Sequence, residues 1–446
     1  MRRLLVAALV AATAPACGTG SASGDAVPVV VGYQSKTINT ATAGTLLRER
    51  GFFEQRLDEL GRRTGKRYEV TWQDYDTGAP ITAQMIAGKV DIGSMGDFPL
   101  LINGSRTQAR GDDGTRMVSV TGYNARGALN MVVVRPDSTA RTLADLAGQR
   151  VSASVGSAGH GTLVRALGDI DVTVENQQPS VGASALQGGG VAALSQFVAW
   201  PGQLVFDKRA KLLYDGAALG IPTLHGVVVR KPFATAQPDV LAEFLRAQLD
   251  ATRYLHENPL AAARSVADAT GLPPEVVYLY NGPNGIATFD LSLKSALRAA
   301  LRDDVPFLES IGDIERLDVD RFIDDGPLRD SGFQGTEDLV NPARITGTDS
   351  ACGIEVGDPA TAGEVWFEGE EATRPAATPD CLLKQVKQAG KGVRAAYVPD
   401  AATGTRWFAE HAHWVREGGK LLPFTTEAAA AARGAVLTYD QALAGA

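Results

Sequence analysis

The chain has 446 residues, enough for about three domains, and 44% of them are hydrophobic, enough to form buried cores. Its 51 acidic and 43 basic residues leave a formal charge of −8, without the positive excess that a nucleic-acid binder uses to hold phosphates. Three cysteines are too few for a disulfide-dense scaffold. We therefore expect a modular globular protein that does not bind nucleic acid.

The first residues are typical of an export signal. Two arginines follow Met1, an apolar run covers residues 4–12, and small residues precede Cys17. The run is too short for a membrane span, which takes about twenty residues. A cysteine after small residues, followed by the polar stretch 18–24, resembles a bacterial lipobox. The resemblance implies a lipid on Cys17 and an exported protein anchored to the outer face of the cell membrane. An ordinary secretory signal with an incidental cysteine is the alternative.

Residues 29–230 alternate short β-rich runs with amphipathic stretches, which is the rhythm of βαβ units. The predicted strands are 29–32, 68–72, 91–94, 130–134, 150–153, 196–200 and 226–230. The predicted helices between them are 45–60, 81–87, 143–147 and 162–167. After Pro238 the pattern predicts four consecutive helices, at 240–255, 259–269, 274–280 and 291–301.

A second change of character comes at residues 329–348, which are rich in Asp, Gly, Asn and Thr and have little apolar periodicity. We predict a domain boundary there. The remaining residues predict an α+β domain, with strands at 364–368 and 393–398 and helices at 380–389 and 426–433. No cysteine occurs in 29–341, which excludes a thiol mechanism in that region.

Three glycine-containing turns each follow an apolar strand and open a predicted helix, at residues 32–36, 93–99 and 156–162. A helix start collects anions because its first N–H groups are unpaired and the helix dipole is positive there. Within the second turn, Asp97 can cap the helix. No GK[ST] follows any turn, so none is a nucleotide loop. Together they suggest an anion site, although each one alone could be an ordinary strand-to-helix turn.

Several segments resemble the solute-binding proteins of nitrate, sulfonate and taurine ABC importers over about residues 29–333. These segments are Gly32-Tyr33-Gln34, Val90 to Gly93, Thr142 to Val151, Phe197 to Pro201 and Val227 to Phe233. The resemblance implies an α/β, two-lobe periplasmic-binding-protein fold with a hinge. Lobe one would comprise 29–122 and 231–333, and lobe two 123–230. The chain then divides into a signal peptide and tether at 1–28, a solute-binding domain at 29–340 and a small α+β domain at 349–446.

The same resemblance implies the function. An extracytoplasmic lipoprotein would capture a small oxyanion-bearing solute between its lobes and deliver it to an ABC transporter permease, without a cofactor. The implied ligand-binding residues are Gln34, Ser35, Gly96, Asp97, Phe98, Ser157, Gly159, His160 and Trp200. Trp200 could instead belong to the core, and His160 could be a satisfied residue of a helix start. The Asp97 carboxylate disfavours a bound anion unless it caps the helix. A zwitterion such as taurine therefore remains an alternative solute.

An enzyme on the same two-lobe scaffold is the competing interpretation. Relatives that use cleft cysteines are excluded by the cysteine-free lobes, and no G-x-S-x-G motif supports a serine triad. We therefore expect a binding protein and not an enzyme.

Residues 350–446 resemble the NosL-type copper accessory lipoproteins of nitrous oxide reductase. The resemblance rests on Cys352-Gly353, Pro379 to Leu383, Tyr397 to Gly404, Pro423-Phe424 and Val436 to Asp440. That family supplies soft ligands for Cu(I) from a Cys-Gly-Met run. Ile354 and Phe424 stand at the two methionine positions here, which predicts weak copper binding. Copper trafficking through this domain is a second alternative function.

Four side chains in this domain are candidates for a metal site: Cys352, Cys381, His411 and His413. A disulfide between the two cysteines is the preferred interpretation in an oxidising compartment, ahead of two free thiols or a metal. The two histidines could also lie on one face of a strand simply because side chains alternate along it, without binding a metal.

Overall fold

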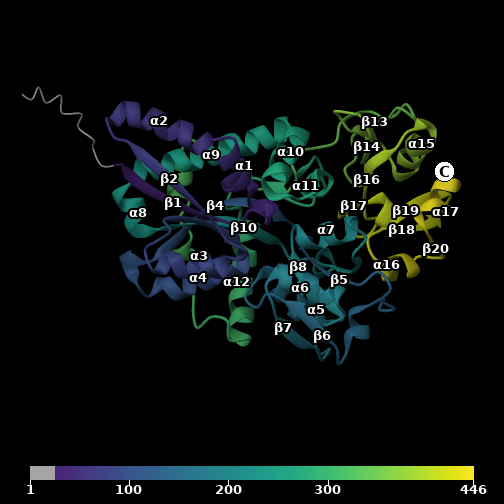
Figure 1. Ribbon diagram of the computed structural model, residues 1–446, viewed down its shortest axis with the longest axis horizontal. Helices are drawn as coiled ribbons and strands as arrows, with labels where there is room; N and C mark the ends of the chain where they lie inside the picture. The colour runs from purple at the N-terminus through teal and green to yellow at the C-terminus, as the bar shows by residue number, and fades with distance from the viewer. Residues whose placement is uncertain (1–25) are drawn as a thin grey trace, which may run out of the picture.

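The computed structural model describes residues 26–446, so Cys17 and its predicted lipid lie outside the described residues. Two mixed sheets with flanking helices form two lobes, and a smaller, mostly antiparallel module lies at one end of the molecule (Figure 1). The predicted α/β two-lobe fold followed by a small domain is confirmed. Within residues 26–446, no helix is both long and apolar enough to cross a membrane.

Lobe one contains a six-stranded sheet in the order β11-β4-β10-β3-β1-β2. Strand β1 runs parallel to β2 and β3, whereas β10 is antiparallel to β3 and β4. The strands are β1 (Val27–Tyr33), β2 (Tyr68–Asp74), β3 (Ile92–Gly96), β4 (Thr115–Asn124), β10 (Thr223–Arg230) and β11 (Thr288–Phe289).

Helices cover both faces of this sheet and bury its apolar side chains in two clusters. The first cluster lies under α2 and the long helix α9, and the second under α3, α4 and α12. The helices of the lobe are α1 (Thr45–Glu49), α2 (Phe52–Thr64), α3 (Gly78–Ile86), α4 (Asp97–Gln108), α8 (Lys231–Ala236), α9 (Pro238–Glu257), α10 (Pro259–Thr270), α11 (Pro274–Asn281), α12 (Ser295–Ser310), α13 (Val319–Phe322) and α14 (Gly326–Asp330).

Lobe two repeats the plan with a five-stranded sheet in the order β7-β6-β8-β5-β9. Strand β6 is parallel to β7 and β8, and β5 is antiparallel to β8 and β9. Its elements are β5 (Asn130–Val134), β6 (Arg150–Ala153), α5 (Ala158–Leu167), β7 (Thr173–Asn176), α6 (Pro179–Gln187), β8 (Ala193–Phe197), α7 (Trp200–Phe206) and β9 (Lys211–Asp215).

The predicted boundary of lobe two at residue 230 is wrong. Strand β10 inserts between β3 and β4 and is therefore a central strand of lobe one. Three predicted elements also change. Residues 45–60 form two helices separated at Gly51, whose φ is 63°; the predicted strand 196–200 ends at Phe197; and the last of the four predicted helices begins at Ser295 instead of Leu291.

Two segments connect the lobes, residues 125–129 between β4 and β5 and residues 216–222 between β9 and β10. They lie against each other at Gly127, where an added Cβ would stand 2.9 Å from the carbonyl oxygens of both Gly216 and Ile221. Its φ of 106° also favours glycine. The Asn124 side chain fixes the first segment, because its Oδ1 accepts the N–H groups of residues 126, 127 and 128, each at 3.0 Å.

The C-terminal module consists of two antiparallel sheets, in the orders β15-β14-β16-β17 and β19-β18-β20, with the short β12-β13 hairpin. Its elements are β12 (Gly347–Thr348), β13 (Glu355–Val356), β14 (Gly363–Phe367), β15 (Arg374–Ala376), α15 (Pro379–Ala389), β16 (Val393–Pro399), β17 (Arg406–Phe408), β18 (His413–Glu417), β19 (Lys420–Phe424), α16 (Glu427–Ala431), β20 (Val436–Leu437) and α17 (Tyr439–Ala444). The predicted helix 426–433 is thus shorter than expected.

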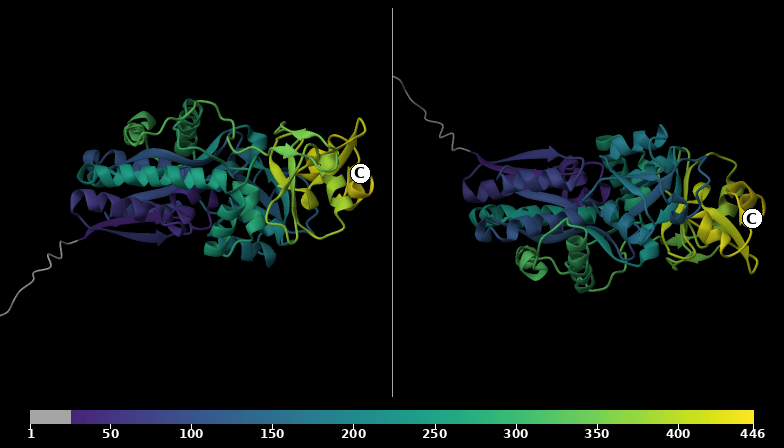
Figure 2. Two further views of the ribbon diagram at one scale, coloured as in Figure 1. Left: turned by 90° about the horizontal axis from the view of Figure 1, so that it is seen from above. Right: turned by 90° about the horizontal axis from the view of Figure 1, so that it is seen from below.

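A buried ion pair inside this module contacts α11. The Arg406 guanidinium donates to Glu364 at 2.7 Å, with side-chain exposures of only 4% and 6%. The hydroxyl of Tyr278, from α11, donates to the same carboxylate at 3.1 Å. Lobe two contacts the module as well, because Thr405 donates to Asp215 of β9 at 2.6 Å. The module therefore packs on both lobes. The views from above and below in Figure 2 show it at one end of the molecule.

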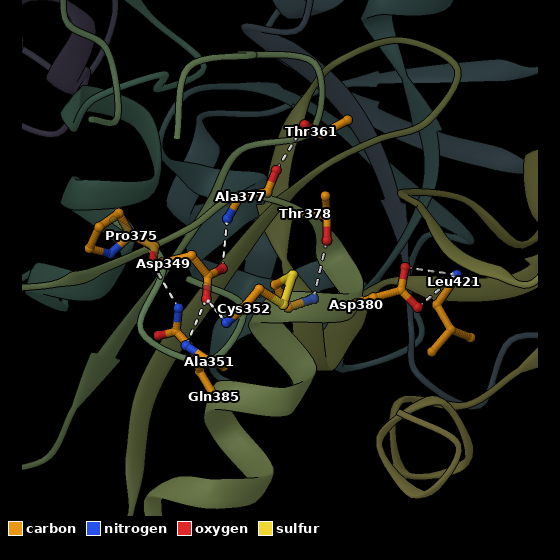
Figure 3. Close-up of a disulfide and its surroundings, with 11 residues drawn as sticks. Asp349, Ala351, Cys352, Thr361, Pro375, Ala377, Thr378, Asp380, Gln385 and Leu421 are labelled. Atoms are coloured by element: carbon orange, nitrogen blue, oxygen red, sulfur yellow. Dashed lines mark hydrogen bonds between the residues drawn. A yellow bond between two sulfur atoms is a disulfide. The ribbon is translucent and has the colours of Figure 1, made fainter. Parts of the chain in front are cut away.

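The disulfide preferred from the sequence is present between Cys352 and Cys381, with Cα atoms 5.9 Å apart (Figure 3). It ties the loop before β13 to the start of α15. Asp349 supports that loop by accepting the N–H groups of Ala351, Cys352 and Ala377 at 2.8 to 2.9 Å. Closing a loop of 29 residues contributes about 3 to 4 kcal/mol in the chain-entropy account.

Candidate functional site

The candidate site lies where the two sheets meet. The carboxyl ends of β1 and β3 in lobe one and of β6 and β8 in lobe two carry polar turns, and in open α/β sheets ligands bind at such edges. The lobes touch there, since α4 packs on α5 and the Ala199 N–H of lobe two donates to the Lys36 carbonyl of lobe one at 3.3 Å. The structure is therefore a closed arrangement of the lobes.

On the lobe-one side, buried amides occupy the strand ends. Gln34 Nε2 donates to the Ser94 carbonyl at 3.1 Å. Asn39 Nδ2 lies 2.6 Å from Nδ1 of His225, which stacks over Gly96 so closely that a Cβ there would be 3.0 Å from Nε2. Burial lowers the pKa of His225 to about 3, so its ring is neutral at physiological pH.

On the lobe-two side, the start of α5 is built tightly onto β8. Ser157 caps the helix, its Oγ accepting the His160 N–H at 3.2 Å. The carbonyl of Gly159 accepts the Ser195 hydroxyl at 2.8 Å, and a Cβ on Gly159 would stand 3.0 Å from Cα of Gln196. This glycine lets the first turn of α5 lie directly against the strand.

Phe98 of α4 fills the space between the lobes. A Cβ added at Gly161 would stand 1.8 Å from its ring, so the ring lies directly on the backbone of α5. Behind Phe98 lies a cavity of about 20 Å³, lined by residues of both lobes that include Asp97, Thr162 and Arg165. That volume holds about one water molecule. The lobes must part to admit a solute.

Arg165 is the main charge at this boundary. It extends from lobe two and donates to Asp304 of α12 in lobe one at 2.8 Å, and its guanidinium also lies 4.4 Å from the ring centre of Phe307. Burial raises the pKa values of Asp97 and Asp304, and Asp97 raises that of Asp304 further, although Arg165 opposes both shifts. A guanidinium thus faces two carboxyl groups that resist ionising together.

Most of the predicted ligand residues meet at this boundary. Gln34, Gly96, Asp97, Phe98, Ser157, Gly159 and His160 lie on its two sides. The His160 ring lies 4.0 Å from Asp313 of lobe one, and burial lowers its pKa. Trp200 begins α7 and lies under the Lys36 ammonium, 5.7 Å from the ring centre.

Ser35 does not take part in this arrangement. Its N–H and hydroxyl both donate to Asp74, at 2.8 and 2.6 Å. Both polar groups therefore already have partners at the end of β2.

Several polar residues of the boundary were missed from the sequence. Ser94 Oγ, Gln196 Oε1 and both side-chain polar atoms of Asn130 are buried without a partner among the described residues. Two of these residues had a signal in the sequence. Ser94 lies inside a predicted turn, and Arg165 follows Ala158 by seven residues, which places both on one helix face. Asp304 carried no local signal, because only the tertiary fold brings α12 to α5.

The predicted four-residue metal set is not assembled, which corrects that alternative. In residues 26–446 the only group of three or more metal-ligating side chains within 4.8 Å of one another is Asp349, Cys352 and Cys381, and both sulfurs are in the disulfide. His411 and His413 line a separate hollow with Lys211 and Glu427. Cys381 lies in α15, whereas His413 begins β18.

Residues 69–262 match the family model described as NMT1/THI5 like. The taurine-binding periplasmic protein of Escherichia coli K12 is 26% identical over 239 residues, covering 51% of this chain and 70% of the relative. A putative aliphatic sulfonates-binding protein of Bacillus subtilis 168 is 26% identical over 270 residues, covering 58% and 76%. The alkanesulfonate-binding protein SsuA of Xanthomonas axonopodis pv. citri, solved with MOPS, has a TM-score of 0.56 at 24% identity, covering 67% and 98%. This last likeness establishes the two-lobe binding-protein fold.

The charges at the boundary define what the site can do. Arg165 and the N-terminus of α5 present donors to an oxyanion, whereas Asp97 and Asp304 can accept an ammonium group. Backbone and amide groups on both sides are neutral. The arrangement is thus suited to reversible binding of a small polar solute.

The acid pair predicts that stability depends on pH. A carboxyl whose pKa is raised by folding stabilises the protein fully below its unfolded pKa of about 4, and this contribution is lost as the pH rises through the folded pKa. The free energy of unfolding should therefore fall between about pH 5 and about pH 9. Asp304→Asn should reduce the total fall in the free energy of unfolding across this pH range by on the order of 1 to 3 kcal/mol. Urea denaturation at several pH values measures this change.

Glu309→Gln is the matched control, because Glu309 is exposed on the same helix and should leave the slope unchanged. Equal slopes for Asp304→Asn and the wild type would show that the buried pair does not titrate as described.

Proposed function

We propose that this chain is the solute-binding component of an ABC importer and captures a small solute of the sulfonate, taurine or nitrate class between its lobes. The proposal rests on the contact between the two lobes, which Arg165 makes with Asp304. It also rests on Ser94 Oγ and Gln196 Oε1, two buried polar atoms without a hydrogen-bond partner among residues 26–446. The sequence relatives named for taurine and aliphatic sulfonates support the solute class.

The proposed ligand contacts come from both sides of the boundary. When the lobes part, the backbone donors at the start of α5 and the Arg165 guanidinium face the opening, and these would hold the oxyanion. Ser94 Oγ and Gln196 Oε1 have no hydrogen-bond partner among residues 26–446. Buried polar atoms without partners are uncommon in folded proteins, so a solute is their natural partner.

The two acids favour a solute that also carries a positive group. One arginine beside two carboxyl groups is a poor environment for a simple anion, because a second negative charge would be desolvated next to Asp97. An aminosulfonate gives each charge an opposite partner. We therefore expect a zwitterion such as taurine to bind more tightly than nitrate.

Binding measurements by calorimetry on the purified mature protein test this function. Taurine and short alkanesulfonates should bind at one site. Ser94→Ala should weaken that binding by about 1 to 3 kcal/mol because a desolvated solute oxygen or N–H loses its partner. The effect on unfolding should be small, since Ser94 Oγ has no partner among residues 26–446. Ser157 is less informative, because its hydroxyl caps α5.

Ser180→Ala provides the control, since Ser180 is exposed on α6 away from the boundary. Tight binding of a neutral or purely cationic solute, with none of taurine, alkanesulfonates or nitrate, would contradict the proposed solute class.

The predicted lipid anchor belongs to the same proposal. No helix in residues 26–446 could span a membrane, so an importer subunit of this kind stays near its permease if Cys17 carries a diacylglycerol. Two acyl chains are about what stable anchoring requires. Cys17→Ser should release the protein from cells into the medium, measured by immunoblotting of fractions. A wild-type protein that is already soluble and has no lipid by mass spectrometry would contradict the anchor.

For the C-terminal module we propose a structural role for the two cysteines. Their disulfide leaves no thiolate for copper, and the two positions equivalent to methionines are Ile354 and Phe424. The resemblance to NosL-type proteins stays a prediction about its fold. Its extensive contacts with both lobes fit a module that is part of the binding protein itself.

A further inference from the structure

A pocket of about 330 Å³ lies where lobe one, the first lobe-connecting segment and the C-terminal module meet. Four segments far apart in the sequence form it: the first lobe-connecting segment with Asn124 and Arg126, the loop after α11 with Asn284, the linker with Arg344, and the turn before β17 with Thr403. It is separate from the interlobe boundary, because the residues lining the two cavities are different.

The pocket is lined by three arginines and by no aspartate or glutamate. Arg126 and Arg344 are exposed, and neither has a carboxylate within 4.0 Å among residues 26–446. Arg406 is the third; among residues 26–446 its one carboxylate partner is Glu364, and it also donates to the Pro283 carbonyl. Its Nε is buried without a hydrogen-bond acceptor in the part of the chain that the structure describes. Glu364 compensates Arg406, whereas Arg126 and Arg344 add two positive charges to the hollow, which an anion between them would stabilise.

The neighbouring acids leave the charges of Arg126 and Arg344 without a partner. Asp215 is buried and accepts the hydroxyls of Thr403 and Thr405, at 3.1 and 2.6 Å. Glu364 is shared between Arg406, Tyr278 and Thr373. The remaining polar groups around the pocket are asparagine and threonine side chains, which suit a multiply oxygenated anion as additional donors.

We propose that this pocket is a second binding site that takes a small oxyanion of the phosphate type, held by Arg126, Arg344 and Arg406. The anion would bridge the lobe-connecting segment, the linker and the C-terminal module, and so hold the module against the lobes. The proposal is independent of the interlobe solute, because none of these arginines lies at that boundary.

Titration calorimetry with inorganic phosphate on the full mature chain, at constant ionic strength, tests the proposal. Binding should saturate at one equivalent and raise the melting temperature as the phosphate concentration increases. The double substitution Arg126→Gln and Arg344→Gln should weaken binding at least tenfold. Since both side chains are exposed, the double variant should melt normally without phosphate. Parallel titration with glycerol 3-phosphate distinguishes a free ion from the phosphate group of a larger molecule.

Two controls distinguish binding in this pocket from a general effect of positive charge and from binding between the lobes. Arg62→Gln with Arg316→Gln removes the same charge from exposed positions elsewhere and should leave phosphate affinity unchanged. Arg165→Gln should weaken sulfonate binding and leave phosphate binding intact. The proposal is wrong if neither phosphate compound saturates, or if the double variant at 126 and 344 binds as tightly as the wild type.

Discussion

Closure of the lobes depends on placing the Arg165 guanidinium of lobe two against Asp304 of lobe one, in a cavity that Asp97 also lines. Removing an arginine and a carboxylate from water costs several kcal/mol, and their mutual attraction returns about the same amount. The pKa values of both acids are raised, so Arg165 and the hydrogen bonds do not fully offset the cost of burying the two carboxylates. Closed and open arrangements are therefore expected to differ little in free energy. A bound solute with opposite charges can decide between them, because a ligand shifts such an equilibrium only by its differential affinity.

The C-terminal module restricts how the lobes can move. It holds α11 through the Glu364–Arg406 pair and Tyr278, and lobe two through Asp215 and the ring contact between Phe206 and Phe408, 5.3 Å apart. Helix α11 is itself bound to lobe two, since Tyr280 Oη accepts the Gly202 N–H at 3.1 Å. We expect these parts to move together against the sheet of lobe one. Bending then falls on the two connecting segments at Gly127 and Gly216.

The sequence predicted the fold well because its signals are local. Apolar strands followed by glycine turns set the βαβ units, and prolines marked the starts of α9, α10 and α11. The lobe assignment of β10 failed because antiparallel insertion between β3 and β4 leaves no local pattern. Trp200 was predicted to end a strand because an apolar run continues past Phe197, where the chain turns into α7.

The candidate site was predictable only where it used helix starts and strand ends. Gln34, Asp97, Ser157 and His160 followed from the turns and from the family resemblance. Arg165 and Asp304 are 139 positions apart and meet only through packing of α5 on lobe one. Ser35 followed the same turn pattern, but Asp74 at the end of β2 captures both its polar groups. Competition between neighbouring side chains cannot be read from the spacing of residues.

Solute-driven closure of the lobes is the central claim, and a distance measurement between them tests it most directly. Spin labels on cysteines placed at exposed positions 62 of α2 and 181 of α6 report the separation of the lobes by double electron–electron resonance. Adding saturating taurine should convert a broad, longer distribution into one narrow, shorter distance. A distribution that stays unchanged while calorimetry shows bound taurine would contradict solute-driven closure.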